Sequence, residues 1–200
     1  MDLQVSVFLL FILFTAGHTL RCYDCMSSTG SCAEEQRITT CPSGSSQCES
    51  STIVTQVGAI TSKVVQIKEC VPVCQSGSIN VGFARMSSSC CNTDQCNAED
   101  APEPSNVPNG KICYYCDGKS CSNTLRCSGD EDRCITATGT SDDQPLVVKG
   151  CASKSICDAK SVRNVESASC CEGNLCNGAQ SVTQSFLFLC CSLLSYFLLH

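Results

Sequence analysis

The same arrangement of ten cysteines occurs twice in this sequence. The first set is Cys22, Cys25, Cys32, Cys41, Cys48, Cys70, Cys74, Cys90, Cys91 and Cys96, and the second is Cys113, Cys116, Cys121, Cys127, Cys134, Cys151, Cys157, Cys170, Cys171 and Cys176. Both sets open with C-x2-C, keep six residues between the fourth and fifth cysteines, and close with CC-x4-CN. A pattern repeated at this spacing predicts two copies of one small domain, at 21–97 and 111–177.

The redox compartment decides whether these cysteines form disulfides or bind metal. Residues 1–20 contain an apolar run from Val5 to Phe14, followed by small residues at 15–17. This layout is typical of a cleavable secretory signal, although it carries Asp2 and no Lys or Arg before the apolar run. A buried N-terminal helix is the alternative. We expect the secretory pathway, and therefore disulfides.

Composition explains why cross-links are needed. The 200 residues include 22 cysteines but no tryptophan, and only 16% are charged. A domain of about 70 residues has a marginal hydrophobic core, and each disulfide contributes about 2–4 kcal/mol. Since each set holds an even number of cysteines, we expect no free thiol between positions 22 and 176.

The long cysteine-free intervals predict β-hairpins. The interval from Cys48 to Cys70 is rich in Val, Ile and Thr on both sides of a break at 58–60, and the interval from Cys134 to Cys151 has the same outline with a polar tip at 139–144. The Asp-Gly pair at 117–118 predicts a tight turn that closes a shorter hairpin. No stretch shows helical periodicity over three turns, so the predicted fold class is all-β and disulfide-rich. Three prolines and several acidic residues predict an exposed, extended linker at 98–110.

These features resemble a known superfamily. The openings LRCYDC (20–25) and KICYYC (111–116), together with the CC-x4-CN endings, resemble the lymphocyte-antigen-6/urokinase-receptor superfamily. Residues 78–97, SINVGFARMSSSCCNTDQCN, are similar to its urokinase-receptor and gamma-type phospholipase-inhibitor members. The resemblance implies two tandem three-finger, snake-toxin-like domains.

The resemblance also implies a disulfide pairing. Carried onto matching positions, it is Cys22–Cys48, Cys25–Cys32, Cys41–Cys70, Cys74–Cys90 and Cys91–Cys96, then Cys113–Cys134, Cys116–Cys121, Cys127–Cys151, Cys157–Cys170 and Cys171–Cys176. Spacing alone does not select this connectivity. Asn97 and Asn177 resemble the structural asparagine of the family, whose side chain bonds neighbouring backbone.

The C-terminal segment 178–200 predicts a lipid anchor. Small residues at Asn177, Gly178 and Ala179 are followed by a polar spacer at 180–185 and an apolar tail at 186–199. This order is typical of a glycosylphosphatidylinositol (GPI) attachment signal, with Asn177 as the lipidated residue and Gly178 or Ala179 as alternatives. A spanning helix is the rival interpretation, but it needs about 20 apolar residues and usually flanking basic residues.

The sequence gives no support for an enzyme, and we expect no metal or cofactor. The two histidines, His18 and His200, lie at the signal boundary and in the removed tail. The acidic clusters at 129–132 and 142–143 lack the alternating spacing of a calcium loop. Each domain is close to neutral, with five basic and six acidic side chains in 21–97 and eight and nine in 111–177, so nucleic acid is not an expected partner.

Protein binding through the hairpin fingers is the class of function that the sequence favours. The candidate contacts with an extracellular or cell-surface protein ligand are Val57, Ile60, Ile79 and Met86, whereas Val81 and Phe83 are assigned to packing between fingers or domains. The leading hypothesis is a GPI-anchored receptor or adhesion protein on the extracellular face of the cell membrane. The alternatives are a soluble secreted protein resembling the phospholipase inhibitors, and a modulator of a membrane receptor or complement complex.

Overall fold

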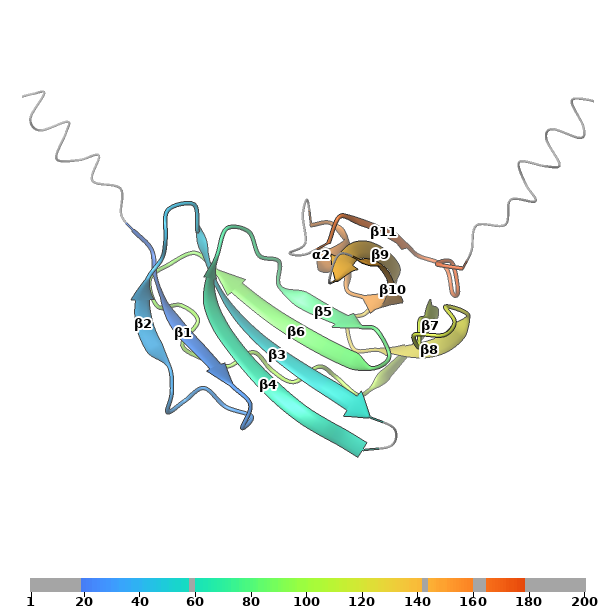
Figure 1. Ribbon diagram of the computed structural model, residues 1–200, viewed down its shortest axis with the longest axis horizontal. Helices are drawn as coiled ribbons and strands as arrows, with labels where there is room; N and C mark the ends of the chain where they lie inside the picture. Colours follow the sequence, from blue (N-terminus) through green and yellow to red (C-terminus); the bar gives the residue numbers. More distant parts are fainter. Residues whose placement is uncertain (1–18, 58–59, 142–143, 160–164, 179–200) are drawn as a thin grey trace, which may run out of the picture.

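A computed structural model describes residues 19–57, 60–141, 144–159 and 165–178 of the chain, and the regular secondary structure of these residues is β-strand apart from one helical turn. The predicted signal segment up to residue 18, the acidic pair at 142–143, Ala179 and the apolar tail lie outside the described residues. The first module consists of β1 (Arg21–Ser27), β2 (Arg37–Thr40), β3 (Gln47–Val57), β4 (Ile60–Val71), β5 (Gly77–Asn80) and β6 (Ala84–Cys91). The second consists of β7 (Pro108–Tyr115), β8 (Asn123–Ser128), β9 (Arg133–Ser141), β10 (Gln144–Ala152), the one-turn helix α2 (Lys154–Cys157) and β11 (Ser167–Cys171) (Figure 1).

The predicted hairpins are present. β3 pairs with β4 from Cys48 opposite Cys70 to the end of the finger, and β9 pairs with β10 in the second module. The shorter hairpin joins β7 and β8. The carboxylate of Asp117 closes its turn by accepting the backbone N–H groups of Lys119 and Ser120, both at 2.8 Å. These two hydrogen bonds lower the pKa of Asp117 below its ordinary value.

Five disulfides cross-link each module internally, and they join the same cysteine pairs that the family resemblance implies. Their sulfurs form the centre of each module. One buried cluster contains Cys22, Cys41 and Cys48, and the corresponding cluster in the second module contains four fully buried cysteines. The cross-links therefore occupy the place that large apolar side chains take in an ordinary core.

The two modules share one sheet. Its strand order is β11-β9-β10-β5-β6-β3-β4-β1-β2, and β5 of the first module pairs antiparallel with β10 of the second, with Asn80 opposite Cys151. Gly150 permits this close approach, because a Cβ atom there would lie 2.0 Å from the carbonyl oxygen of Asn80. The repeat predicts two domains but not their fusion into a nine-stranded sheet.

Most of the linker is exposed, but its backbone does not run free of the first module. It is held there from Ala98 to Pro102, where Ala101 is only 3% exposed; Pro104 is also buried, and the last three residues of the predicted linker belong to β7. The physical reason is that polar side chains of the sheet hold the linker backbone: Ser50 Oγ accepts the N–H of Ala101 at 2.9 Å, and Ser87 donates to the carbonyl of Pro102. Pro- and Glu-rich composition alone does not reveal these partners.

Candidate ligand-binding surface

A row of apolar side chains crosses the central strands on one face of the sheet. Ile53 on β3 lies opposite Val65 on β4 and opposite Met86 on β6, and Met86 lies opposite Ile79 on β5. Residues directly opposite each other share a face of a sheet, so these side chains are neighbours. All four are half-buried, and Met26 on β1, opposite Ile67 on β4, extends the apolar face with a side chain 77% exposed. We call Met26, Ile53, Val65 and Met86 the apolar face.

One predicted contact residue proves to be part of the junction between modules. Ile79 packs against a buried cluster of the second module formed by Ile135, Ala152 and Ile156. It lies directly opposite Ala152 in the sheet. The second module therefore already contacts the Ile79 side chain, and a role of Ile79 in ligand contact stays a prediction.

The structure describes the other residues singled out in the sequence to different extents. Met86 remains half-buried within the apolar face. The backbones of Val57 and Ile60 pair at the end of the β3–β4 hairpin, but their side chains lie outside the described part of the chain. Phe83, which the sequence assigned to packing, is 59% exposed in the loop before β6.

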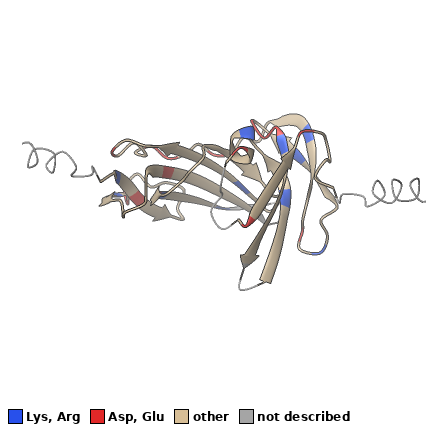
Figure 2. Ribbon diagram, turned by 90° about the horizontal axis from the view of Figure 1, so that it is seen from above, with Lys and Arg blue, Asp and Glu red and all other residues tan. Residues whose placement is uncertain are grey.

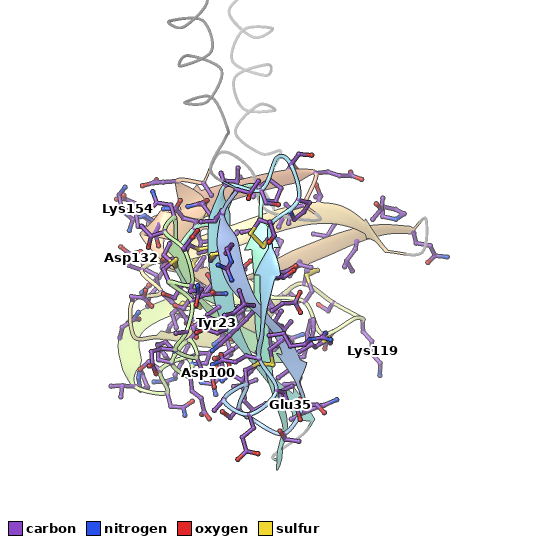
Figure 3. The ribbon with its side chains drawn as sticks, turned by 90° about the vertical axis from the view of Figure 1, so that its left-hand side faces the viewer. Tyr23, Glu35, Asp100, Lys119, Asp132 and Lys154 are labelled. Carbon is purple, nitrogen blue, oxygen red and sulfur yellow. A yellow bond between two sulfur atoms is a disulfide. The ribbon has the colours of Figure 1, made fainter. Side chains whose placement is uncertain are left out.

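The opposite face of the first module is polar and is covered by the linker. Lys68 on β4 is 2% exposed, and its ammonium group donates to Gln36 Oε1 at 2.7 Å and to the carbonyl of Ala98. The same nitrogen lies 3.0 Å from a carboxylate oxygen of Asp100. In Figure 3, Asp100 lies within the body of the first module, whereas Lys119 projects from the periphery. A buried lysine needs such partners, because an unpaired buried charge is costly.

Asp100 ties together three parts of the first module. Its carboxylate accepts hydrogen bonds from Ser31 Oγ at 3.0 Å and from the N–H of Cys32 at 3.2 Å, in addition to its ion pair with Lys68. Burial acts to raise the pKa of Asp100, but these hydrogen bonds and the Lys68 charge outweigh it, so the pKa lies below its ordinary value. The linker is consequently fixed to the loop between β1 and β2 as well as to β4.

The junction between modules is also polar. Ser78 exchanges backbone and side-chain hydrogen bonds with Ser153, and its hydroxyl donates to the carboxylate of Asp130. Glu131 is 1% exposed and accepts the N–H of Ser128 at 2.8 Å, while the Asn80 side chain bonds its carboxyl group. Burial raises the pKa of Glu131 to about 7, and the neighbouring Asp130 charge adds to the effect.

The asparagine after the last cysteine of each module has a structural role. Asn177 is 5% exposed, accepts the N–H of Tyr114 and donates to the carbonyls of Tyr114 and Ile135, each at 2.9 Å. Asn97 makes the equivalent bonds to Tyr23 and Glu49. Each asparagine thus joins the first strand of its module to the central hairpin.

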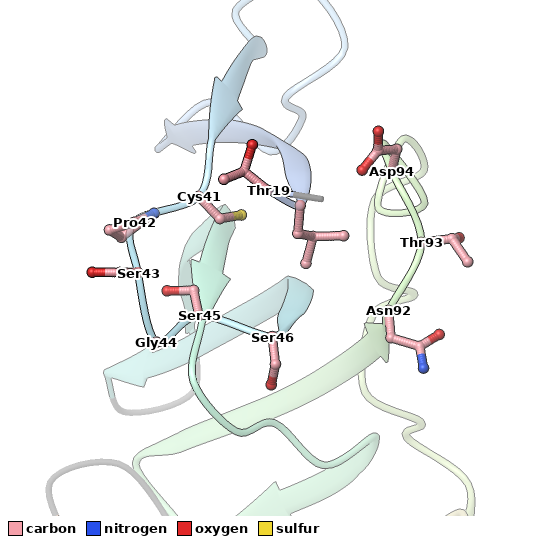
Figure 4. A pocket seen from close by; sticks show the side chains of 11 residues that line it. Thr19, Cys41, Pro42, Ser43, Gly44, Ser45, Ser46, Asn92, Thr93 and Asp94 are labelled. Atoms are coloured by element: carbon pink, nitrogen blue, oxygen red, sulfur yellow. The ribbon is translucent and has the colours of Figure 1, made fainter. Parts of the chain in front are cut away.

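A cavity of about 740 Å³ lies at the disulfide end of the first module. Figure 4 shows the loop from Cys41 to Ser46 on one side and Asn92, Thr93 and Asp94 on the other, with Thr19 between them. Five of its lining residues carry a hydroxyl group, and the others include Leu20 and Pro42. It adjoins residues outside the described part of the chain, and we assign no ligand to it.

The closely spaced cysteines of the described residues are all in disulfides. Within each module three cysteine sulfurs lie within 4.8 Å of one another: those of Cys22, Cys41 and Cys70 in the first, and those of Cys113, Cys127 and Cys151 in the second. Every one of these cysteines is in a disulfide and offers no thiolate. Basic and acidic residues occur on both modules without either sign forming a continuous band (Figure 2). The apolar face is the surface that best fits a protein partner.

Comparisons with known proteins agree with this architecture. A profile of the u-PAR/Ly-6 domain matches residues 18–99, and a profile described as snake toxin and toxin-like protein matches residues 112–177. The chain is 36% identical over 109 residues to the urokinase plasminogen activator surface receptor of Aotus trivirgatus, across 46% of this chain and 32% of that receptor. It is 34% identical over 125 residues to the receptor of the same name from Rattus norvegicus, across 52% and 38%.

A third relative is matched over most of its own length. Sperm acrosome membrane-associated protein 4 of Bos taurus is 33% identical over 95 residues, which covers 44% of this chain and 75% of that protein. The chain spans only about a third of the length of the two urokinase receptors that it matches. The profile matches, the ten disulfides and the extensive match to the bovine protein together show that this chain is a member of the u-PAR/Ly-6 family, with two domains of the three-finger fold.

Proposed function

We propose that this protein is a GPI-anchored cell-surface binding protein of the receptor or adhesion type, and that it recognises a protein ligand through the apolar face. The observation that carries the proposal is the row formed by Ile53, Val65 and Met86, three half-buried apolar side chains on adjacent strands of a rigid sheet. Apolar side chains grouped on a rigid surface are typical of protein contacts. The urokinase receptors among the relatives support a receptor role.

Anchoring is supported by the sequence that follows the second module. Small residues, a polar spacer and an apolar tail occur in the order that GPI transfer requires. The structure describes no helix that is long and apolar enough to cross a bilayer, and its described ranges do not include the apolar tail. We shift the expected attachment residue from Asn177 to Ala179, because Asn177 is buried, and because Gly178 donates its N–H to Leu175 and lies against the Tyr114 ring.

The anchor is tested by treating intact cells with phosphatidylinositol-specific phospholipase C. We expect release of the protein in soluble form, with a C-terminal peptide that ends at Ala179 and carries the glycolipid remnant. Retention on cells together with a peptide ending at His200 would indicate a spanning helix instead. Secretion without treatment, in a form that lacks the tail, would favour the soluble inhibitor-like alternative.

Ligand binding is tested with a soluble fragment, 19–178, applied to cells that bind it. The variant Met86→Ser is expected to weaken binding, because it replaces the apolar side chain at the β6 end of the apolar face with a polar one. The matched control is Val107→Ser, since Val107 is 72% exposed but lies in the linker segment. Equal binding by both variants would exclude the apolar face as the contact surface.

A further inference from the structure

The chain contains two Asn-Gly pairs, 109–110 and 177–178. In such a pair the backbone nitrogen of glycine is able to attack the asparagine side-chain carbonyl, because glycine has no side chain that obstructs the approach. The two pairs have the same covalent chemistry. The structure places them in different surroundings, so any difference in their reactivity must come from the fold.

Asn177 is held away from this reaction. Its side-chain oxygen accepts the N–H of Tyr114, and its amide nitrogen donates to carbonyls on β7 and β9. The attacking nitrogen, that of Gly178, donates its hydrogen to the carbonyl of Leu175 at 3.2 Å. With Asn177 only 5% exposed, water also has little access to the side chain.

Asn109 is accessible to water, unlike Asn177. Asn109 and Gly110 are exposed, and the β7–β8 register skips residues 109–111 between Pro108 and Ile112. The N–H of Lys111 donates to Asn109 Oδ1 at 3.0 Å, which is the oxygen on which negative charge develops during attack at Cγ. A donor in position at that oxygen lowers the barrier. Because Tyr114 supplies such a donor to Asn177 as well, the feature that distinguishes the two sites is the exposure of Asn109 against the burial of Asn177. Gly110 has a φ of +91°, a conformation that favours glycine.

We propose that Asn109 is a deamidation site of the folded protein. The nitrogen of Gly110 forms a bond to Asn109 Cγ, and the bond from Cγ to Nδ2 breaks. The proton of Gly110 passes through water to the leaving nitrogen, which departs as ammonia and leaves a succinimide. Water then opens the ring at Cγ to give aspartate, or at the main-chain carbonyl to give isoaspartate, and nothing is oxidised or reduced.

This change removes two hydrogen bonds that support the junction between modules. Asn109 Nδ2 donates to the carbonyl oxygens of Gly129 at 3.1 Å and Glu131 at 3.0 Å. A carboxylate has no hydrogen to donate, so after deamidation an anion faces two carbonyl oxygens. The same turn carries Asp130 and Glu131, whose side chains contact Ser78 and Asn80 of the first module. Deamidation therefore loosens the pairing of β5 with β10.

The first test compares the two Asn-Gly pairs by peptide mapping with mass spectrometry. Mature protein purified from cells is incubated in mildly alkaline buffer, in its native form and after reduction and alkylation. In the native form we expect conversion at Asn109 and none at Asn177, whereas in the reduced chain both pairs convert at similar rates. Equal conversion in the native protein, or no conversion at Asn109 there, would overturn the proposal.

The second test measures the effect on the junction by amide hydrogen exchange in β5 and β10. Aged protein and the product variant Asn109→Asp should both exchange roughly tenfold faster there than fresh protein, as the loss of two hydrogen bonds implies. The control is Asn174→Asp, because Asn174 Oδ1 accepts the N–H of Ile112 and aspartate keeps that acceptor. If the control exchanges as fast as Asn109→Asp, added charge alone explains the change and the proposed loss of donor bonds is wrong.

Discussion

Replacing Glu131 with glutamine is expected to remove a pH dependence from the stability of this protein. The Glu131 side chain is enclosed at the junction between modules, bonded to the N–H of Ser128 and to Asn80. Burial raises the pKa of its carboxyl group from an ordinary 4.5 to about 7, with a further increase from Asp130 and a partial offset from Arg85. The folded protein therefore holds a proton that the unfolded chain releases at lower pH.

The magnitude follows from the size of this pKa difference. At about 1.4 kcal/mol per pH unit, the change from 4.5 to about 7 corresponds to on the order of 3 kcal/mol. Below pH 4.5 the carboxyl group is protonated in both the folded and the unfolded state, so the folded protein bears no cost for a buried charge and its free energy of unfolding is highest. As pH rises from 4.5 to about 7 the free energy of unfolding falls, and above about 7 it stays at the lower value.

The assay is guanidinium unfolding with all disulfides intact, at several pH values from 4.5 to above the folded pKa. Glu131→Gln should gain stability relative to the unmodified protein by up to about 3 kcal/mol as pH rises, because a neutral amide has no ionisation cost. Glu103→Gln, at an exposed linker position, is the control and should show no such trend. A difference between Glu131→Gln and the unmodified protein that is constant across this range would refute the reasoning.

Three further predictions concern the first module. Lys68→Met should lower the free energy of unfolding by about 3–5 kcal/mol, because it leaves the linker carboxylate without its cation, whereas Lys63→Met at an exposed position should have little effect in the same denaturation assay. Asn97→Ala should cost about 3 kcal/mol by calorimetry, since three hydrogen bonds to backbone groups are lost. N-terminal sequencing of the mature protein should find Leu20 retained, because its carbonyl accepts the N–H of Cys41 at 2.7 Å; this moves the expected cleavage point upstream from the end of the 1–20 segment, and a chain that starts at Arg21 would contradict it.

Local signals made the hairpins predictable from the sequence. The pattern from Cys48 to Cys70 places Val and Ile at strand positions with a break at the finger tip, and the structure has its hairpin there. Such signals are local, since each depends on residues within one finger. The family resemblance supplied the pairing of cysteines distant in sequence, and the structure forms the same pairs.

The junction and the linker were not predictable, because their causes are not local. β5 has only four residues, of which Ile79 is the one large apolar side chain, and its partner strand belongs to the other module. The linker composition is that of an exposed segment, but its backbone finds partners on a sheet face where Ser50, Thr52 and Lys68 are buried. The sequence does show these polar residues alternating with Val and Ile along the hairpin, which predicts a sheet with one polar face. It does not show that the linker covers this face, because the polar face of an ordinary antiparallel sheet is exposed to water.

The pairing of β5 with β10 has a consequence for synthesis on the ribosome. Asn80 meets Cys151 roughly 70 residues later in the chain, which at about 5–20 residues per second means roughly 4–14 seconds of translation. Throughout that interval the first module, even when its own disulfides have closed, presents the backbone of β5 as an open strand edge. An open edge is a template for pairing with other chains. The nascent protein therefore has a defined period in which a chaperone must cover this edge, and that period ends when the second module emerges.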